Sequence, residues 1–161
     1  MHDSDRFPNR KNPRLENYDY STPNYYFVTI CTKNKSCIFG TITHPNSYGE
    51  IAEQGLLEIP AHFPNVEIDK YIVMPNHIHA IIVLQKGAKN LSTIIGQYKS
   101  YVTRCIHREN PKLEIWQTSF HDHVIRNQNS YEHIWNYIDG NRQKWQEDCY
   151  FTEESYAPAG S

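Results

Sequence analysis

This sequence lacks several features that mark whole classes of protein. No apolar run in it approaches the roughly 20 residues with which a helix crosses a bilayer, so no helical membrane span is expected. The segment 1–14 is polar and holds no apolar signal-peptide core, which leads us to expect a cytoplasmic protein. None of the four cysteines forms a CxxC pair, so neither a zinc ribbon nor a thioredoxin-type site is expected. The formal net charge is only -2, which by itself gives no support to a nucleic-acid partner.

The composition is that of an ordinary globular domain. Of the 161 residues, 39% are hydrophobic and 21% are charged, which provides enough apolar side chain for a core of its own. We expect one domain over residues 25–146, preceded by an irregular N-terminal arm over 1–24 and followed by an acidic C-terminal tail over 147–161.

Basic residues are concentrated in the segment 86–112, where Glu109 is the one acidic side chain. The basic residues of this segment are Lys86, Lys89, Lys99, Arg104, Arg108 and Lys112. A basic helix on a neutral body can bind phosphates, but a basic stretch this short is more often a plain solvated face. The 12 tyrosines likewise suit either stacking on unpaired bases or filling a small core.

Hydrophobic periodicity and turn residues divide the chain into strands and helices. We expect strands over 25–32, 66–73 and 78–84, short extended pieces at 115–116 and 123–126, and helices over 51–63, 91–107 and 130–141. Ser92 and Ser130 are the expected N-caps of the last two helices. This order predicts an α+β protein with a ferredoxin-like antiparallel sheet and helices packed on one face.

A pair of histidines, His77 and His79, follows the expected turn at 74–76 and begins a strongly apolar strand. Residues two apart in a strand share a face, so both imidazoles project to the same side while Ile78 enters the opposite layer. Two imidazoles on one face form a bidentate platform for a metal, although His-x-His is also the pattern of two exposed strand histidines. The position between a turn and a buried strand favours the metal, because a substrate can reach the sheet surface there.

A third ligand can be sought by spacing. Tyr137 and Asn141 lie four residues apart on the last expected helix and therefore share a face. An amide oxygen from Asn141 would complete an open His-His-Asn site, which suits Mg²⁺ or Mn²⁺ better than structural zinc, with Tyr137 one turn away. Taken singly, Tyr137 is also typical of a packed helix tyrosine and Asn141 of a helix C-terminus. The combination with the histidines favours the metal site.

With these motifs, the sequence resembles the single-tyrosine HUH transposases. His77-Ile78-His79 looks like the HUH motif of histidine, bulky hydrophobe and histidine, and the pair Tyr137 and Asn141 looks like the tyrosine motif of the family. Further similarity lies in the segments 14–21, 98–100, 115–117 and 123–126, which follow the order of the family. The chain is most similar to the REP-associated tyrosine transposases and their insertion-sequence relatives.

The resemblance implies a metal-assisted transposase that cleaves and rejoins single-stranded DNA near hairpins through a 5′-phosphotyrosine intermediate. It implies Tyr137 as the nucleophile, with His77, His79 and Asn141 as ligands of Mg²⁺ or Mn²⁺. The residues expected to contact DNA are Lys99, Arg104, Arg108, Arg126 and Arg14. Arg142 stands where members of the family often carry proline, which leaves the end of the last helix less defined. Both a monomer and a homodimer are compatible with the family.

Two other functions fit the same residues. One is a metal-dependent nuclease in which water attacks the phosphate, and the other is a DNA-hairpin-binding protein that has lost catalysis. Other tyrosines are weaker candidates for the nucleophile, because Tyr98 has Val102 at i+4, which cannot bind a metal, and Tyr101 has Cys105 there, a soft ligand poorly matched to Mg²⁺. Spacing therefore favours Tyr137.

Overall fold

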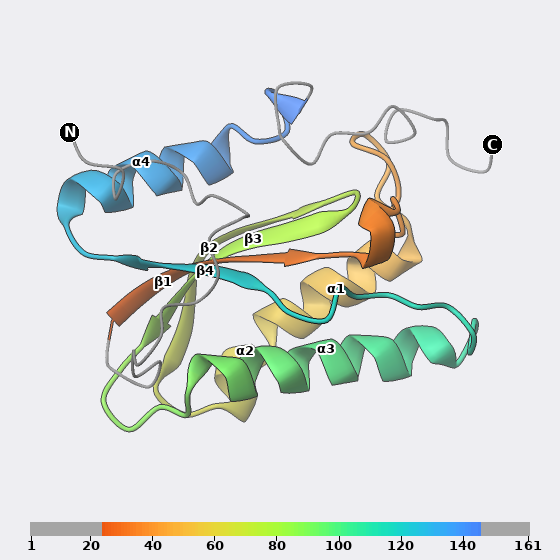
Figure 1. Ribbon diagram of the computed structural model, residues 1–161, viewed down its shortest axis with the longest axis horizontal. Helices are drawn as coiled ribbons and strands as arrows, with labels where there is room; N and C mark the ends of the chain where they lie inside the picture. Colours follow the sequence, from red (N-terminus) through yellow and green to blue (C-terminus); the bar gives the residue numbers. More distant parts are fainter. Residues whose placement is uncertain (1–23, 146–161) are drawn as a thin grey trace.

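One antiparallel sheet of four strands organises residues 24–145, the part of the chain that the computed structural model describes (Figure 1). Its strands are β1 (Asn24–Cys31), β2 (Val66–Met74), β3 (His77–Leu84) and β4 (His121–Ile125), in the spatial order β2-β3-β1-β4. β3 lies between β1 and β2 and runs antiparallel to both, so β1 and β2 form the split pair of a ferredoxin-like sheet. The predicted α+β fold is confirmed.

The pairing of the two central strands, β1 and β3, determines which of their residues lie opposite one another. β3 is buried along its whole length, because both of its faces are covered. The residues at its start pair with the end of β1, His77 opposite Cys31 and His79 opposite Thr29. β2 and β3 form the expected hairpin, and its turn is shorter than predicted, since Met74 still belongs to β2.

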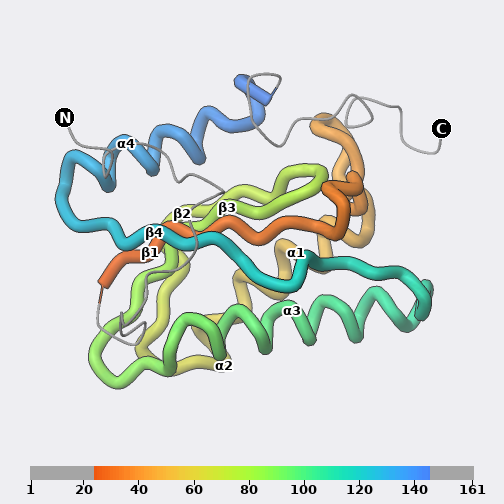
Figure 2. Tube along the Cα trace, in the orientation of Figure 1, coloured from red at the N-terminus to blue at the C-terminus, as the bar shows by residue number. Residues whose placement is uncertain are grey.

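Three helices cover one face of the sheet, as Figure 2 shows below the strands. They are α1 (Ser47–Leu57), the short α2 (Ile59–His62) and α3 (Leu91–His107), and a 3₁₀ turn, η2 (Lys33–Lys35), follows β1. Their buried side chains join those of the strands in one large cluster that includes Leu56, Ile82 and Val102. Tightly packed aliphatic side chains of this kind supply most of the stabilisation of a domain of this size.

The last helix, α4 (Gln128–Asp139), corrects the expectation that the helices share one face. It lies on the opposite face of the sheet, above the strands in Figure 1. Ile134 and Ile138 of α4 pack there against Phe27, Ile81 and Ile125 in a second, smaller cluster. These strand residues alternate with those of the large cluster, so the second face also carries apolar side chains that need a cover.

The helix ends differ from prediction in their capping residues. Asn90 caps α3 and Asn127 caps α4, each accepting a hydrogen bond from the backbone N–H three residues on, whereas Ser92 and Ser130 were expected. Asn46 caps α1 in the same way, so this helix begins at Ser47 and not at residue 51. Asparagine and serine side chains cap equally well, so composition alone does not choose between neighbouring candidates.

Two further expectations concern the chain as a whole. Among the helices within residues 24–145, none is long and apolar enough to span a membrane. Within the same residues, Cys31, Cys37 and Cys105 form no disulfide with one another. The predicted arm over 1–24 and tail over 147–161 lie almost wholly outside the described residues and stay predictions.

Candidate catalytic centre

The two histidines lie side by side at the start of β3, on the face that α4 covers. His77 is 0% and His79 is 2% exposed, and their ring centroids are 4.5 Å apart. Ile78 between them belongs to the large cluster on the other face, as the alternation of a strand requires. The structure thus confirms that both imidazoles project to one side, and it shows them buried.

Each imidazole is oriented by a hydrogen bond at its Nδ1 atom. Nδ1 of His79 lies 2.9 Å from Oγ1 of Thr29, the residue opposite it on β1. Nδ1 of His77 lies 2.8 Å from Oδ1 of Asn76. Because an amide oxygen only accepts, Nδ1 of His77 carries the proton and donates, which leaves the lone pair of that ring on Nε2. This is the usual arrangement around a metal-binding histidine.

Burial also keeps His77 neutral. Desolvation lowers the pKa of His77 well below its usual value, and the neighbouring His79 lowers that pKa further. A metal ligand must offer an unprotonated nitrogen, so the neutral ring that burial favours is the form required for coordination.

Tyr137 reaches this histidine pair from α4. Its phenol oxygen lies 3.3 Å from Nε2 of His79, and its ring packs edge-on against Phe27 at 6.2 Å between centroids. Trp145 closes the other end of the site by stacking on His77, with centroids 5.6 Å apart and ring planes 29° apart. The predicted tyrosine therefore does meet the predicted histidines, although β3 and α4 are far apart in the sequence.

Asn141 lies just beyond the helix rather than on it. α4 ends at Asp139, and the backbone N–H of Asn141 donates to the carbonyl of Ile138 in the turn that follows. Asn141 is buried, with 2% of its surface exposed. Along the chain it follows Tyr137, which contacts His79, and precedes Trp145, which stacks on His77. Arg142 holds this turn in place by donating to the carbonyls of Ile42 and Val73.

A bulge in β2 attaches α4 to the sheet by polar contacts. The register slips between Ile68 and Lys70, so Asp69 and Lys70 both make contacts with α4. Tyr131 donates to the carboxylate of Asp69 at 2.5 Å, and Lys70 forms a 2.8 Å ion pair with Asp139. Nζ of Lys70 also lies 3.8 Å from the ring centroid of Trp135. These contacts fix the helix that carries Tyr137.

The donor set suits a divalent cation of the magnesium class. Imidazole nitrogens and an amide oxygen are borderline to hard ligands, and a cation of this class held by His77, His79 and Asn141 would supply Lewis-acid chemistry. Within residues 24–145, no group of three or more His, Cys, Asp or Glu side chains is arranged to hold a metal. Among these residues, a third protein ligand at this site would have to be of another type, such as the amide oxygen of Asn141.

The competing tyrosines lie on the other side of the sheet. Tyr98 of α3 is buried in the large cluster, and its hydroxyl donates to the carbonyl of Ala52 at 2.7 Å. Burial raises the pKa of Tyr98 above its usual value, which disfavours a phenolate there. Tyr101 is on the same helix, and a hydrogen bond with Cys105 raises its pKa. Neither residue is on the face that carries His77 and His79.

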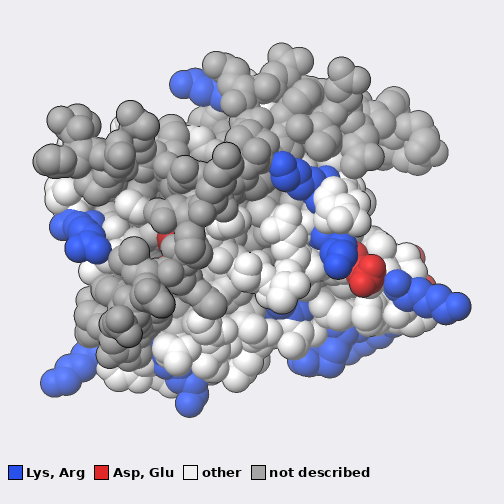
Figure 3. All heavy atoms as spheres, viewed as in Figure 1, with Lys and Arg blue, Asp and Glu red and all other residues white. Residues whose placement is uncertain are grey.

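The residues expected to contact DNA are dispersed. Lys99, Arg104 and Arg108 belong to α3 or its end, on the face opposite the histidines, and Lys99 donates to the carbonyls of Gln117 and Ser119. Arg126 is exposed after β4, and Arg14 lies outside the described residues. Figure 3 shows one face of the molecule, where lysine and arginine side chains are scattered and few acidic ones are in view.

Several residues of the site escaped the sequence analysis. Thr29 and Asn76 orient the imidazoles, Trp145 stacks on one of them, and Asp69 anchors the helix of Tyr137. Asn76 could have been identified from the sequence, because it directly precedes His77. The others depend on strand register and helix placement, which no local pattern reveals.

The sequence and the fold of this chain are similar to those of known proteins. The model of a family described as "Transposase IS200 like" matches residues 19–141, which include both histidines, Tyr137 and Asn141. An uncharacterized protein of Haemophilus influenzae is 32% identical to the chain, and the alignment covers 89% of the chain and 94% of that protein. A REP-associated tyrosine transposase of Escherichia coli is 35% identical, over 70% of the chain and 62% of its own length.

A solved structure has the same fold. It is a REP-associated tyrosine transposase bound to a REP hairpin, and it superposes with a TM-score of 0.67 at 23% identity. The superposition covers 83% of this chain and 74% of that one.

Proposed function

Because the chain belongs to the family of IS200-like transposases, we propose that it cleaves and rejoins single-stranded DNA beside hairpins through a covalent 5′-phosphotyrosine at Tyr137. One observation carries this proposal, namely the phenol oxygen of Tyr137 3.3 Å from Nε2 of His79 on a shared face of the sheet. A tyrosine that served only to pack α4 would not need its hydroxyl at the imidazole pair. The hairpin substrate is suggested by the REP-associated relatives, one of which is bound to such a hairpin.

In this proposal, His77, His79 and Asn141 would hold one Mg²⁺ or Mn²⁺. Such a cation would polarise the scissile phosphate and lower the free energy of a phenolate nearby. Thr29 and Asn76 keep the two imidazoles in one orientation, and Trp145 shields His77 from water. The lone pair on Nε2 of His77 thereby already has a fixed orientation, available to the proposed metal ion, before DNA binds.

Tyr137 supplies the covalent chemistry. Its phenol oxygen attacks the phosphorus, forms a tyrosyl phosphoester with the 5′ side of the cut and breaks the bond to the 3′ oxygen. The phenol proton leaves to solvent, and the departing 3′ oxygen takes a proton from solvent. Since one phosphoester replaces another, a second 3′-hydroxyl can reverse the reaction and join a new strand. Contacts from α4 to Asp69 and Lys70 keep the phenol in line.

The test is adduct formation on a panel of labelled oligonucleotides. Single strands with a hairpin and an unpaired flank, plain single strands and regular duplexes are incubated with the full chain and Mg²⁺ at matched salt, then run on denaturing gels. We expect a protein–DNA adduct on unpaired DNA next to a hairpin and none on duplex, because in-line attack requires a backbone that can be splayed.

Tyr137→Phe should abolish the adduct while DNA binding persists, because only a hydroxyl is removed. Tyr101→Phe is the matched control and should form the adduct at the wild-type rate. Full adduct formation by Tyr137→Phe would remove this residue from the mechanism. Cleavage without any adduct would identify a nuclease that uses water, and hairpin binding without cleavage would identify an inactive binding protein.

A further inference from the structure

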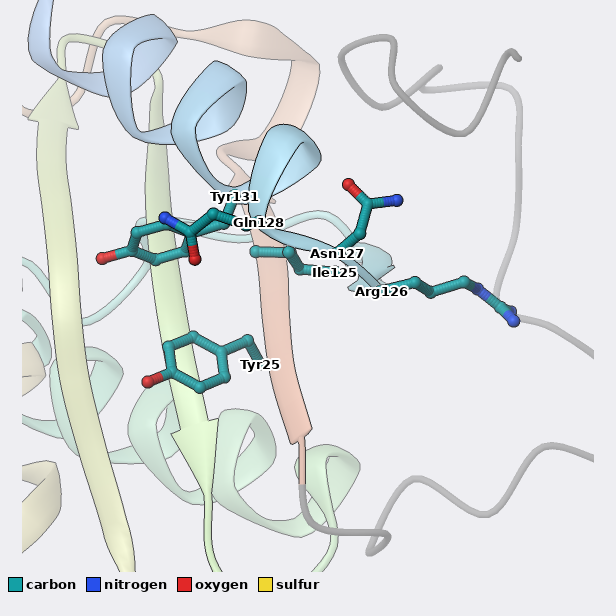
Figure 4. Close-up of a pocket in the computed structure, with 6 residues that line it drawn as sticks. All are labelled: Tyr25, Ile125, Arg126, Asn127, Gln128 and Tyr131. Carbon is teal, nitrogen blue, oxygen red and sulfur yellow. The ribbon is translucent and has the colours of Figure 1, made fainter. Parts of the chain in front are cut away.

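A pocket with a volume of about 350 Å³ lies at the far end of the same face from the histidines. Six residues line it, from the start of β1, the end of β4 and the first turns of α4: Tyr25, Ile125, Arg126, Asn127, Gln128 and Tyr131. Figure 4 shows the ring of Tyr25 on one side of this hollow and Gln128 and Tyr131 across from it. Tyr131 also holds α4 to Asp69, and none of the other five has a role in the proposed covalent step.

Tyr25 is the feature of this pocket that calls for a ligand. It is 40% exposed and, with Leu57, is one of two large hydrophobic side chains exposed within residues 24–145. Its ring centroid lies 5.6 Å from that of Tyr131, with the planes at 86°, so the two rings form a corner and not a stack. A flat ring can therefore lie on the face of Tyr25 without displacing Tyr131.

The polar groups around the ring suit a nucleotide. Gln128 and Asn127 bring side-chain amides, which can bind base edges, although each already makes one hydrogen bond, to Glu132 and to the backbone of Ser130. Arg126 is exposed and, in Figure 4, extends outward from the end of β4, away from the tyrosine rings. A base at the tyrosines would place its backbone phosphate toward the rim, where a guanidinium is available.

The pocket also lies at a suitable distance from Tyr137. Tyr25 and Thr29, which binds His79, are four residues apart on β1, or about 13 Å at 3.3 Å per residue. Tyr131 and Tyr137 are six residues apart on α4, or about 9 Å at 1.5 Å per residue. A nucleic-acid strand with about 3.4 Å per stacked nucleotide covers this span in roughly two to four nucleotides.

We propose that this pocket binds one unpaired base of the DNA strand, stacked on Tyr25 and with its phosphate near Arg126, a few nucleotides from the bond that Tyr137 attacks. The inference rests on the proposed function and adds to it a subsite that sets the position of the cut. A strand held at both the pocket and the histidines has its scissile phosphate fixed in register, and the base at Tyr25 then contributes to the choice of sequence.

Equilibrium binding separates this subsite from the chemistry. Fluorescence anisotropy of a labelled 16-residue oligothymidylate with the full chain in EDTA measures affinity with cleavage suppressed. Removal of one stacking ring costs about fivefold or more in affinity, so Tyr25→Leu should weaken binding by at least that factor and Tyr25→Phe should not. Leu57→Ala, the matched control on the opposite side of the sheet, should bind as the wild type does.

Arg126→Gln should weaken binding and lower the slope of log affinity against log salt concentration by about one. Arg126→Lys keeps the positive charge and should leave that slope unchanged.

Position is tested with the oligonucleotide that forms the Tyr137 adduct. 2-Aminopurine, a fluorescent base that is quenched on stacking, is placed at each position around the cleaved bond in turn. Quenching at one position two to four nucleotides from the cut, lost in Tyr25→Leu and kept in Leu57→Ala, is the expected result. Normal adduct formation with equal affinity and quenching in Tyr25→Leu would overturn the subsite and leave the transposase function intact. Absence of both binding and adduct in the wild type would overturn the two proposals together.

Discussion

The two faces of the sheet are built from alternating residues of the same strands, yet they differ in what holds them together. The face covered by α1, α2 and α3 is a continuous aliphatic and aromatic core. Within residues 24–145, the α4 face has two small apolar clusters, one around Phe27 and Ile81 and one of Cys31, Met74 and Trp145, and beside them lie the imidazoles, Thr29 and polar contacts to α4. One face therefore carries most of the hydrophobic stabilisation, and the other can bury polar groups that are needed for chemistry.

The division runs through single strands with a period of two. In β3, Ile78 belongs to the large core while its neighbours His77 and His79 form the site. Because β3 pairs with β1 and β2 on both sides, its register is fixed, and the imidazoles cannot move without moving the core. The pairing of β3 with both neighbouring strands thus holds the proposed catalytic groups in place.

The largest difference between the faces should appear at His79. Replacing His79 by Ala removes a proposed ligand, and we expect Mn²⁺ affinity to fall more than about 100-fold, since even partners that only orient ligands contribute 10- to 100-fold. Adduct formation should be lost with it. Calorimetric titration with Mn²⁺ measures the first effect, and denaturing gels measure the second. Mn²⁺ binding equal to that of the wild type would show that the pair is not a metal site.

The adjacent residue should give the opposite result. Ile78→Ala leaves a cavity in the large core, and we expect a loss of about 2–5 kcal/mol in the free energy of unfolding, with adduct formation per folded molecule unchanged. Urea denaturation followed by circular dichroism measures the loss. If the variant fails to fold, Ile78→Val, with an expected cost of about 0.5–1.5 kcal/mol, serves the same purpose. A specific loss of chemistry in folded Ile78→Val would contradict the separation of the two faces.

The sequence was informative wherever local pattern decides structure. The bounds of α3 agree with the prediction at both ends, and the placement of His77 and His79 on one side follows from alternation alone. Spacing favoured Tyr137 over Tyr98 and Tyr101, because of these three only Tyr137 has an oxygen ligand at i+4. Asn141 was selected by its spacing from Tyr137, but it lies in the turn after α4 and not on the helix, and its role as a metal ligand stays a prediction.

Other features required information that local pattern does not contain. The side of the sheet on which α4 packs depends on which strand face remains uncovered once α1 and α3 are in place. The β2 bulge did leave a signal, because the inward residues Val66, Ile68, Tyr71 and Val73 are spaced by two, three and two. The strand expected over 66–73 included no bulge, so the contact of Asp69 with α4 did not follow from it. The bond between Thr29 and His79 depends on pairing across 50 positions.

Thr29 offers a smaller test of the α4 face. Thr29→Val keeps the volume of the side chain and removes the hydroxyl that orients His79. We expect Mn²⁺ affinity to fall by about 10- to 100-fold, because the imidazole loses its fixed orientation. Thr29→Ser keeps the hydroxyl and should bind Mn²⁺ almost as the wild type does. Equal affinities of the Val and Ser variants would mean that the hydrogen bond has no part in metal binding.

The smallest expected effects concern two chemically similar hydrogen bonds, one on each face of the sheet. Tyr131 of α4 donates to Asp69, and Tyr71 of β2 donates to Glu53 of α1. Both are hydrogen bonds from a phenol to a carboxylate near the surface. The hydrogen bond with Asp69 raises the pKa of Tyr131 to about 12, and burial together with Glu53 raises that of Tyr71.

Asp69→Asn and Glu53→Gln should each lower the free energy of unfolding by about 1 kcal/mol or less, because each weakens one exposed, charge-assisted hydrogen bond. Their effects on chemistry should differ. α4 has few apolar anchors, so weakening the contact between Tyr131 and Asp69 allows the helix to shift, and we expect adduct formation to slow by several-fold. α1 is held by the large core, so Glu53→Gln should form the adduct at the wild-type rate. Single-turnover rates with saturating DNA and Mg²⁺ make the comparison, and equal slowing by both variants would mean that the polar contacts of α4 have no special part in positioning Tyr137.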